Sequence, residues 1–90
     1  MINLIEKYIK IYIDKLKTED IKKFSLENNI YIDNNELEII YKYIKQNWYE
    51  ICFKENEITF NKIKPLLKND TYEKAKLLIE EYKKRYKSYL

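Results

Sequence analysis

A chain of 90 residues with a formal net charge of +3 can form only one small domain, which a single hydrophobic core must hold together. Hydrophobic residues at 46% exclude a disordered chain, and the lone cysteine excludes the intramolecular disulfides that small secreted domains normally carry. The uncharged runs are too short to cross a membrane, and the first residues do not have the pattern of a signal peptide. We therefore expect a single cytoplasmic domain over residues 1–90.

The hydrophobic periodicity predicts an all-α fold, a small compact bundle of four to five helices. The first helix is expected over residues 3–17, because its apolar residues recur at steps of three and four. These residues form one stripe: Leu4, Ile5, Tyr8, Ile9, Tyr12, Ile13 and Leu16. Opposite them lie the charged residues of the same segment, as expected for a helix at the surface of a core.

A short second helix is expected over residues 19–28, with Thr18 as its N-cap and Ile21, Phe24 and Ser25 turned inward. Asn29 is expected to end it, because the chain contains no glycine and asparagine is the next-best residue for the left-handed conformation. The two isoleucines of the following link, Ile30-Tyr31-Ile32, can point the same way.

The third helix is expected to start at a capping box formed by Asp33 and Glu36. Its inward residues are Leu37, Ile40, Tyr41, Ile44 and Trp48. The helix either breaks near Asn47 or continues through Cys52, and the sequence does not decide between them. Because the run from Trp48 to Phe53 is apolar, Cys52 is expected to be a buried, inert thiol.

Two alternatives remain open for the segment around Pro65. Asn61 can cap a helix with Pro65 in its first turn, or a kinked helix can begin at Glu57. The last helix is expected from Asp70 to Ser88, with Glu73 completing a second capping box. Its apolar residues follow a heptad pattern: Tyr72, Ala75, Ile79, Tyr82, Tyr86 and Tyr89. Packing within the bundle is the favoured use of this pattern, and a homodimer through Tyr82, Tyr86 and Tyr89 is the alternative.

The residue types that catalysis and cofactor binding need are missing. Without histidine there is no Ser–His pair, no Cys–His pair and no histidine-ligated metal, and without glycine there is no phosphate-binding loop. The paired carboxylates, Glu19-Asp20 and Glu80-Glu81, occupy helical positions expected to face solvent. We therefore expect no enzyme, no cofactor, no metal site and no small-molecule substrate.

The positive charge is concentrated at the C-terminal end. Lys83, Lys84, Arg85 and Lys87 are four of the 18 basic residues, and without them the 15 acidic residues are in excess by one. These four side chains are candidate contacts to phosphate or to a partner, although basic residues are also favoured at a helix C-terminus. A helix-turn-helix over residues 19–47 is disfavoured, because its turn would be too long and its second helix contains no arginine.

Tyrosines outside the core stripes favour a protein partner. Tyr31, Tyr43, Tyr49 and Tyr89 are expected to lie off these stripes, and tyrosine is a preferred anchor at interfaces. We expect a helical interaction or adaptor protein, in which the partner is another protein or a second copy. A weak nucleic-acid-associated protein that uses the basic C-terminal end is the alternative.

The order of caps and core residues also suggests a family. A Thr-Glu-Asp-Ile start at Thr18, the Ile-x-Ile link and the Asp-capped helix after it are followed by Asp70-Thr71-Tyr72-Glu73. This pattern resembles a small uncharacterised family from low-GC Gram-positive bacteria, domain of unknown function 2624. The resemblance implies a helical cytoplasmic fold but neither an activity nor site residues. The chain departs from the pattern at Asn29, where glycine is expected, and residues 48–53 do not align.

Overall fold

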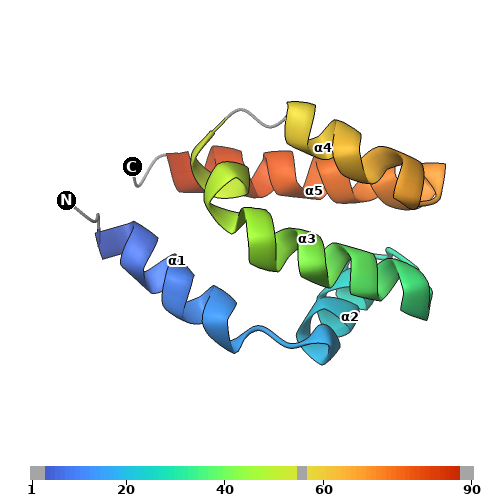
Figure 1. Ribbon diagram of the computed structural model, residues 1–90, viewed down its shortest axis with the longest axis horizontal. Coiled ribbons are helices and arrows are strands. Elements are labelled where there is room, and N and C mark those ends of the chain that lie inside the picture. Colours follow the sequence, from blue (N-terminus) through green and yellow to red (C-terminus); the bar gives the residue numbers. More distant parts are fainter. Residues whose placement is uncertain (1–3, 55–56, 88–90) are drawn as a thin grey trace.

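The computed structural model describes residues 4–54 and 57–87, and these residues form five α-helices and one short 3-10 helix, with no strand. The elements are α1 (Leu4–Lys15), α2 (Thr18–Glu27), α3 (Asn34–Phe53), α4 (Glu57–Ile63), the 3-10 helix η1 (Lys64–Leu66) and α5 (Asn69–Lys87). The expected compact all-α bundle is confirmed (Figure 1). Among the described residues, no helix combines the length and the hydrophobicity that a membrane span requires.

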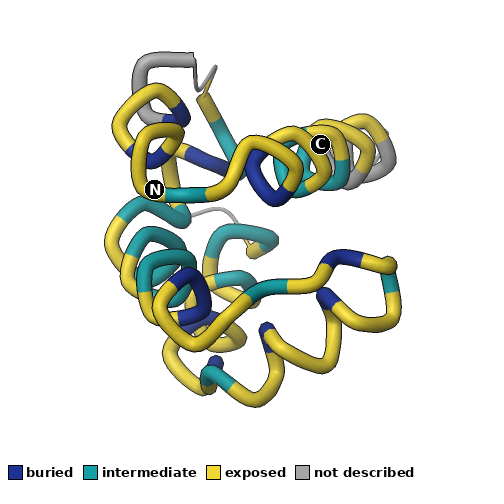
Figure 2. The backbone as a smooth tube through the Cα atoms, turned by 90° about the vertical axis from the view of Figure 1, so that its right-hand side faces the viewer, coloured by how far each residue is buried: buried dark blue, intermediate teal, exposed yellow. Residues whose placement is uncertain are grey.

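The helix α3, 20 residues long, lies in the middle of the molecule, with α1 and α2 on one side and α4 and α5 on the other (Figure 1). Each side has its own small core. The first core is built around Ile13, Leu16, Ile21 and Leu37, and the second around Phe60, Ile63 and Tyr72. Ile40 of α3 packs against both cores. The buried positions therefore lie between neighbouring helices, while most of the outer backbone is exposed (Figure 2).

The helix α1 is amphipathic, but its apolar stripe is only partly covered. Ile13 and Leu16 are buried and Ile9 packs against the first core, as the periodicity predicts. Leu4, Tyr8 and Tyr12 were expected to lie inward with them, and this expectation is wrong, because all three are exposed. The apolar arc of α1 is wider than the surface that α3 offers it.

The second helix begins one residue earlier than expected, at Thr18, so that Lys17 and not Thr18 is its N-cap. The Lys17 backbone N–H donates to Oδ2 of Asp20 over 2.9 Å. Ser25 is buried as expected, whereas the inward position predicted for Phe24 is wrong, because Phe24 is 40% exposed. Phe24 lies three residues after the buried Ile21, on the edge of a helix that is too short to be covered on both sides.

Asparagine replaces glycine at the end of α2, as expected. Asn29 has φ 60°, and its N–H donates to the Leu26 carbonyl while the next N–H, of Ile30, donates to Ser25. These two bonds are those of the Schellman motif, which satisfies the last carbonyls of a helix. The turn directs Ile30 into the protein, where it is buried, and leaves Tyr31 outside.

The helix α3 starts at the predicted capping box and does not break near Asn47. Asp33 Oδ1 accepts from the Glu36 N–H over 2.8 Å, and Glu36 Oε1 accepts from the Asp33 N–H over 3.4 Å. Asn47 lies inside the helix, where its side-chain amide donates to the Tyr43 carbonyl over 3.0 Å. The side chain shares this carbonyl, one turn earlier, with the helix backbone, and α3 continues without a break. Cys52, expected to be buried, is only half-buried.

Of the two alternatives around Pro65, the helix from Glu57 is the one observed. Asn61 lies within α4 and not at a helix start, and Pro65 lies in η1, where the tighter 3-10 turn tolerates its missing N–H. The last helix starts at Asn69, one residue earlier than expected. The prediction of a second capping box is wrong, because Asp70 lies inside the first turn of α5 and its carboxylate pairs with the Lys74 ammonium over 3.2 Å.

Candidate interaction surface

The outer face of α1 carries four exposed apolar side chains on a single stripe. Leu4, Tyr8 and Tyr12 are 69%, 68% and 65% exposed, and Ile11 is 44% exposed. With about 100° of rotation per residue, these four positions fall within roughly a third of the helix circumference. We call them the α1 stripe.

The α1 stripe lies directly beside the buried side of the same helix. Ile13 and Leu16 follow it around the circumference, so that hydrophobic residues occupy about half of the helix surface. Tyrosine side chains bury roughly 150–250 Å² each when covered, so Tyr8 and Tyr12 alone expose on the order of 200–300 Å². The largest apolar patch on an ordinary monomer measures about 300–600 Å² and is often functional, and with Leu4 and Ile11 the α1 stripe falls in this class.

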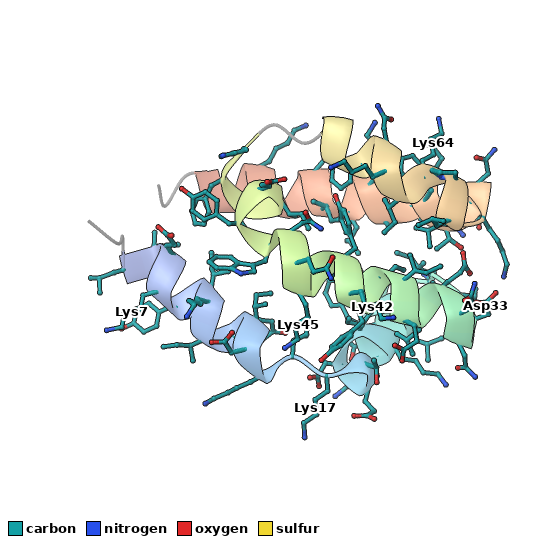
Figure 3. The ribbon with its side chains drawn as sticks, viewed as in Figure 1. Lys7, Lys17, Asp33, Lys42, Lys45 and Lys64 are labelled. Atoms are coloured by element: carbon teal, nitrogen blue, oxygen red, sulfur yellow. The ribbon has the colours of Figure 1, made fainter. Side chains whose placement is uncertain are left out.

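A lysine from α3 holds the C-terminal end of α1 in place. Lys45 Nζ donates to the carbonyls of Ile13 and, over 3.2 Å, of Asp14, which are among the last in α1 (Figure 3). Carbonyls in the last turn of a helix have no partner within the helix, and a cation also interacts favourably with the helix dipole there. The α1 stripe is therefore presented on a helix whose end is fixed to the central helix.

The C-terminal residues that the sequence singles out lie mostly outside what the structure describes. Of the four basic residues, Lys84 is exposed on α5. The positions of Tyr82, Lys83, Arg85, Tyr86 and Lys87 belong to α5, but their side chains are outside the described part, and Tyr89 lies outside the described residues. The basic end and the tyrosine homodimer face both stay predictions.

The four tyrosines that were expected to lie outside the core differ in their burial. Tyr31 and Tyr49 are exposed as predicted, and Tyr31, at 72%, stands alone in the link between α2 and α3. The prediction is wrong for Tyr43, which packs against the second core with its hydroxyl buried and without a hydrogen-bond partner in the described part of the chain. Burial, and to a lesser extent Glu50 and Tyr72, raise the pKa of Tyr43 to about 12. Tyr89 lies outside the described residues.

A buried carboxylate joins the start of α3 to the start of α5. Glu36 is 3% exposed, and its Oε2 accepts from the backbone N–H of Lys68 over 2.9 Å, in addition to the capping bond to Asp33. The Lys68 ammonium lies 3.4 Å from Glu36 Oε1 and 3.5 Å from Asp33 Oδ2. The sequence predicted the capping role of Glu36 but missed Lys68, which is 32 residues away.

The electrostatics of this cluster point to a structural role. The charge of Glu36 and its hydrogen bond are the largest causes that raise the pKa of Lys68, and the charge and hydrogen bond of Asp33 contribute less. The hydrogen bond from the Glu36 N–H is the main reason why the pKa of Asp33 lies below its usual value, and the charge of Lys68 lowers this pKa further. Both Glu36 oxygens already accept hydrogen bonds, so this carboxylate has little capacity left for a substrate. Among the described residues, no three His, Cys, Asp or Glu side chains are grouped so that they could hold a metal ion.

Comparisons with known proteins do not assign this chain to a class. A scan against protein-family models finds no match. Searches of curated proteins and of solved structures find no significant similarity either. The resemblance to domain of unknown function 2624 therefore stays a prediction, and the α1 stripe has to be interpreted from its own chemistry.

Proposed function

We propose that this protein is a small helical interaction or adaptor domain that binds a protein partner, either a different protein or a second copy, through the outer face of α1. The observation that supports it is the α1 stripe, in which two tyrosines and two aliphatic residues are exposed together on one helix. Tyrosine is enriched among the residues that dominate binding energy at protein interfaces. An amphipathic helix that binds through residues spaced by three and four is a common recognition mode.

The chemistry of the stripe favours a protein over a charged ligand. Its four members are apolar or phenolic, whereas phosphate is bound by lysine or arginine side chains or by backbone N–H groups. An isolated exposed aromatic residue is ordinary, but four neighbouring apolar residues on one helix are not. We also propose that the protein has no catalytic activity and acts in the cytoplasm, which the lack of histidine and glycine and the single cysteine support.

Photo-crosslinking tests the proposed function in living cells. A photoreactive phenylalanine analogue at position 8 should give a discrete crosslinked product, because Tyr8 lies in the middle of the stripe. The same analogue at Tyr31 is the matched control, since this tyrosine is equally exposed but isolated. Substituting Tyr12→Glu should abolish the product from position 8. No product from position 8, or the same product from both positions, would contradict the proposal.

A second candidate function is weak nucleic-acid association through the basic C-terminal end. It is supported by the excess of positive charge in residues 83–87 and by the exposure of Lys84 on α5. Changing Lys83, Lys84, Arg85 and Lys87 together to Gln should remove any binding to DNA or RNA at low salt. In the unmodified chain, this binding should weaken steeply as salt is added. Binding that is unaffected by the four substitutions would contradict this candidate.

A further inference from the structure

We propose that the partner of the α1 stripe is α1 of a second copy of this chain, packed antiparallel about a two-fold axis near Ile11. This inference rests on the proposed function, because it identifies the occupant of the same surface. Two-fold symmetric pairs are the commonest oligomers, and their interfaces must be complementary to themselves. The charges beside the stripe meet this requirement.

Two opposite charges flank the stripe along one edge. Lys7 and Asp14 are seven residues apart, which is two helical turns, so both lie on the same side of α1, next to Ile11. When two identical helices pack antiparallel, the same edge of each faces its copy in reverse order. Lys7 of one copy therefore faces Asp14 of the second copy, and the symmetry produces this ion pair twice.

Both charges are available for such a pair. No described residue forms an ion pair with Lys7, which points away from α3 (Figure 3). Among the described residues, the Asp14 carboxylate pairs with Lys10 alone, over a long 4.0 Å in the same helix, and both side chains remain well exposed. In a parallel pair, the edge with Lys7 and Asp14 would face the opposite edge, which Ile5 and Tyr12 line. The antiparallel arrangement alone brings opposite charges together.

The same two-fold axis places aliphatic residues against aliphatic residues and tyrosines against tyrosines along the stripe. Ile11 meets Ile11 of the second copy, and Tyr8 meets Tyr12 of the second copy on either side of it. Leu4 lies seven residues from Ile11, beyond Lys15 of the second copy, so it stays at the edge of the contact. Tyr8, Ile11 and Tyr12 are thereby covered.

The contact is small, so the dimer should be weak. Stable interfaces bury about 800 Å² on each partner, and one helix face provides less than this. We expect a dissociation constant in the micromolar range or above, on the order of 10 µM. The molecule should therefore exchange between monomer and dimer at accessible concentrations, which makes the equilibrium measurable.

A charge-reversal series measured by sedimentation equilibrium tests the inference. Lys7→Glu alone places two acidic groups together, and Asp14→Lys alone places two basic groups together, so each should raise the dissociation constant roughly tenfold. The double variant Lys7→Glu/Asp14→Lys restores opposite charges and should return to within about threefold of the original value. Lys42→Glu, at an exposed site on α3, is the control for net charge.

These substitutions do not threaten the helix itself. Lys7→Glu places an acid near the N-terminus of α1 and Asp14→Lys places a base near its C-terminus, and the helix dipole favours both changes. Circular dichroism should show unchanged helix content in every variant. Recovery of the dimer in the double variant supports the antiparallel pair, and no recovery overturns it.

Disulfide trapping gives a second, independent measure of direction. In a Cys52→Ser background, a Lys7→Cys chain mixed with an Asp14→Cys chain should give mainly the mixed disulfide, whereas a parallel pair keeps the two edges on opposite sides and gives no preferred disulfide between them. A chain that stays monomeric at millimolar concentration also overturns the inference. If the chain stays monomeric but position 8 crosslinks to a different protein, the proposed function stands and only the homodimer is overturned. If the chain stays monomeric and position 8 gives no crosslinked product, both the homodimer and the proposed function are overturned.

Discussion

Glu36 connects the ends of two helices through one buried side chain. It occupies the third position of α3, from which it reaches back to the Asp33 N–H, as in an ordinary capping box. Its second oxygen accepts from the Lys68 N–H, immediately before α5. One carboxylate therefore satisfies a backbone donor at the start of each helix, and Lys68 neutralises its charge from the exposed side. A buried charge is tolerated only with such partners.

Replacing Glu36 with Gln should lower the free energy of unfolding by about 1–3 kcal/mol, because one of the two accepting oxygens becomes a donor that faces backbone N–H groups. Urea unfolding at neutral pH would measure the change. Glu38→Gln is the matched control on the same helix, since Glu38 is exposed, and it should stay within about 0.5 kcal/mol of the unmodified chain. Equal stabilities for the two variants would contradict the structural role of Glu36.

The buried hydroxyl of Tyr43 predicts a stabilising substitution. Because this hydroxyl has no hydrogen-bond partner among the described residues, Tyr43→Phe removes a desolvated polar group. It keeps the ring, whose centre lies 6.3 Å from the centre of the Phe60 ring. We expect the free energy of unfolding to rise by about 0.5–1.5 kcal/mol at neutral pH. Tyr31→Phe, at an exposed position, should have no measurable effect. A destabilised Tyr43→Phe variant would indicate that the hydroxyl has a partner after all.

The pKa of Tyr43 adds a pH dependence with a definite sign. The pKa is raised from 10.0 to about 12 on folding, so the unfolded chain releases this proton first as the pH rises. The stability linked to this proton is complete below pH 10 and is lost between pH 10 and 12. The stability advantage of Tyr43→Phe should therefore grow over that range. Comparison with the unmodified chain cancels the titration of the other tyrosines and of the lysines.

At the scale of single elements, α1 depends on Lys45. This side chain donates to the Asp14 carbonyl and to the Ile13 carbonyl, which also accepts from the Leu16 N–H, and its ammonium lies 5.5 Å from the centre of the Tyr41 ring. Lys45→Met should keep most of the packing and lose the cap, at a cost of about 1 kcal/mol. Hydrogen exchange should become faster in the last turn of α1. Lys42→Met, one turn earlier and exposed, should change neither quantity, and an equal effect of both would contradict the capping role.

Elements set by local chemistry could be predicted from the sequence. The capping box at Asp33 and the left-handed Asn29 are decided within a few residues of chain, because the bonds that form them join neighbours. The second box at Asp70 failed for a tertiary reason, since Lys68, which precedes α5, is bound by Glu36 from another helix. Periodicity also found the apolar side of α1, but it could not show how much of that side α3 covers.

At the scale of the whole molecule, two small cores share one helix. Among the described side chains none is less than 2% exposed, so neither core is large enough to be stable alone. Leu37 of α3 lies in the first core and Ile39 packs against the second, and Ile40 touches both. Unfolding either core would therefore expose part of the helix on which the other core depends. We infer that both cores and α3 form one cooperative unit.

Hydrogen exchange can separate this arrangement from two independent halves. The central amides of α3 should exchange only through global unfolding. The amides of α5 beyond Ile79 should exchange faster, because Glu80, Glu81 and Lys84 are exposed. Ile13→Val in the first core and Ile63→Val in the second should each cost about 1 kcal/mol. Each should then accelerate the α3 amides roughly fivefold, since the loss of either core releases the same helix. If Ile13→Val accelerated only α1 and α2, and Ile63→Val only α4 and α5, the shared helix would not couple the two cores.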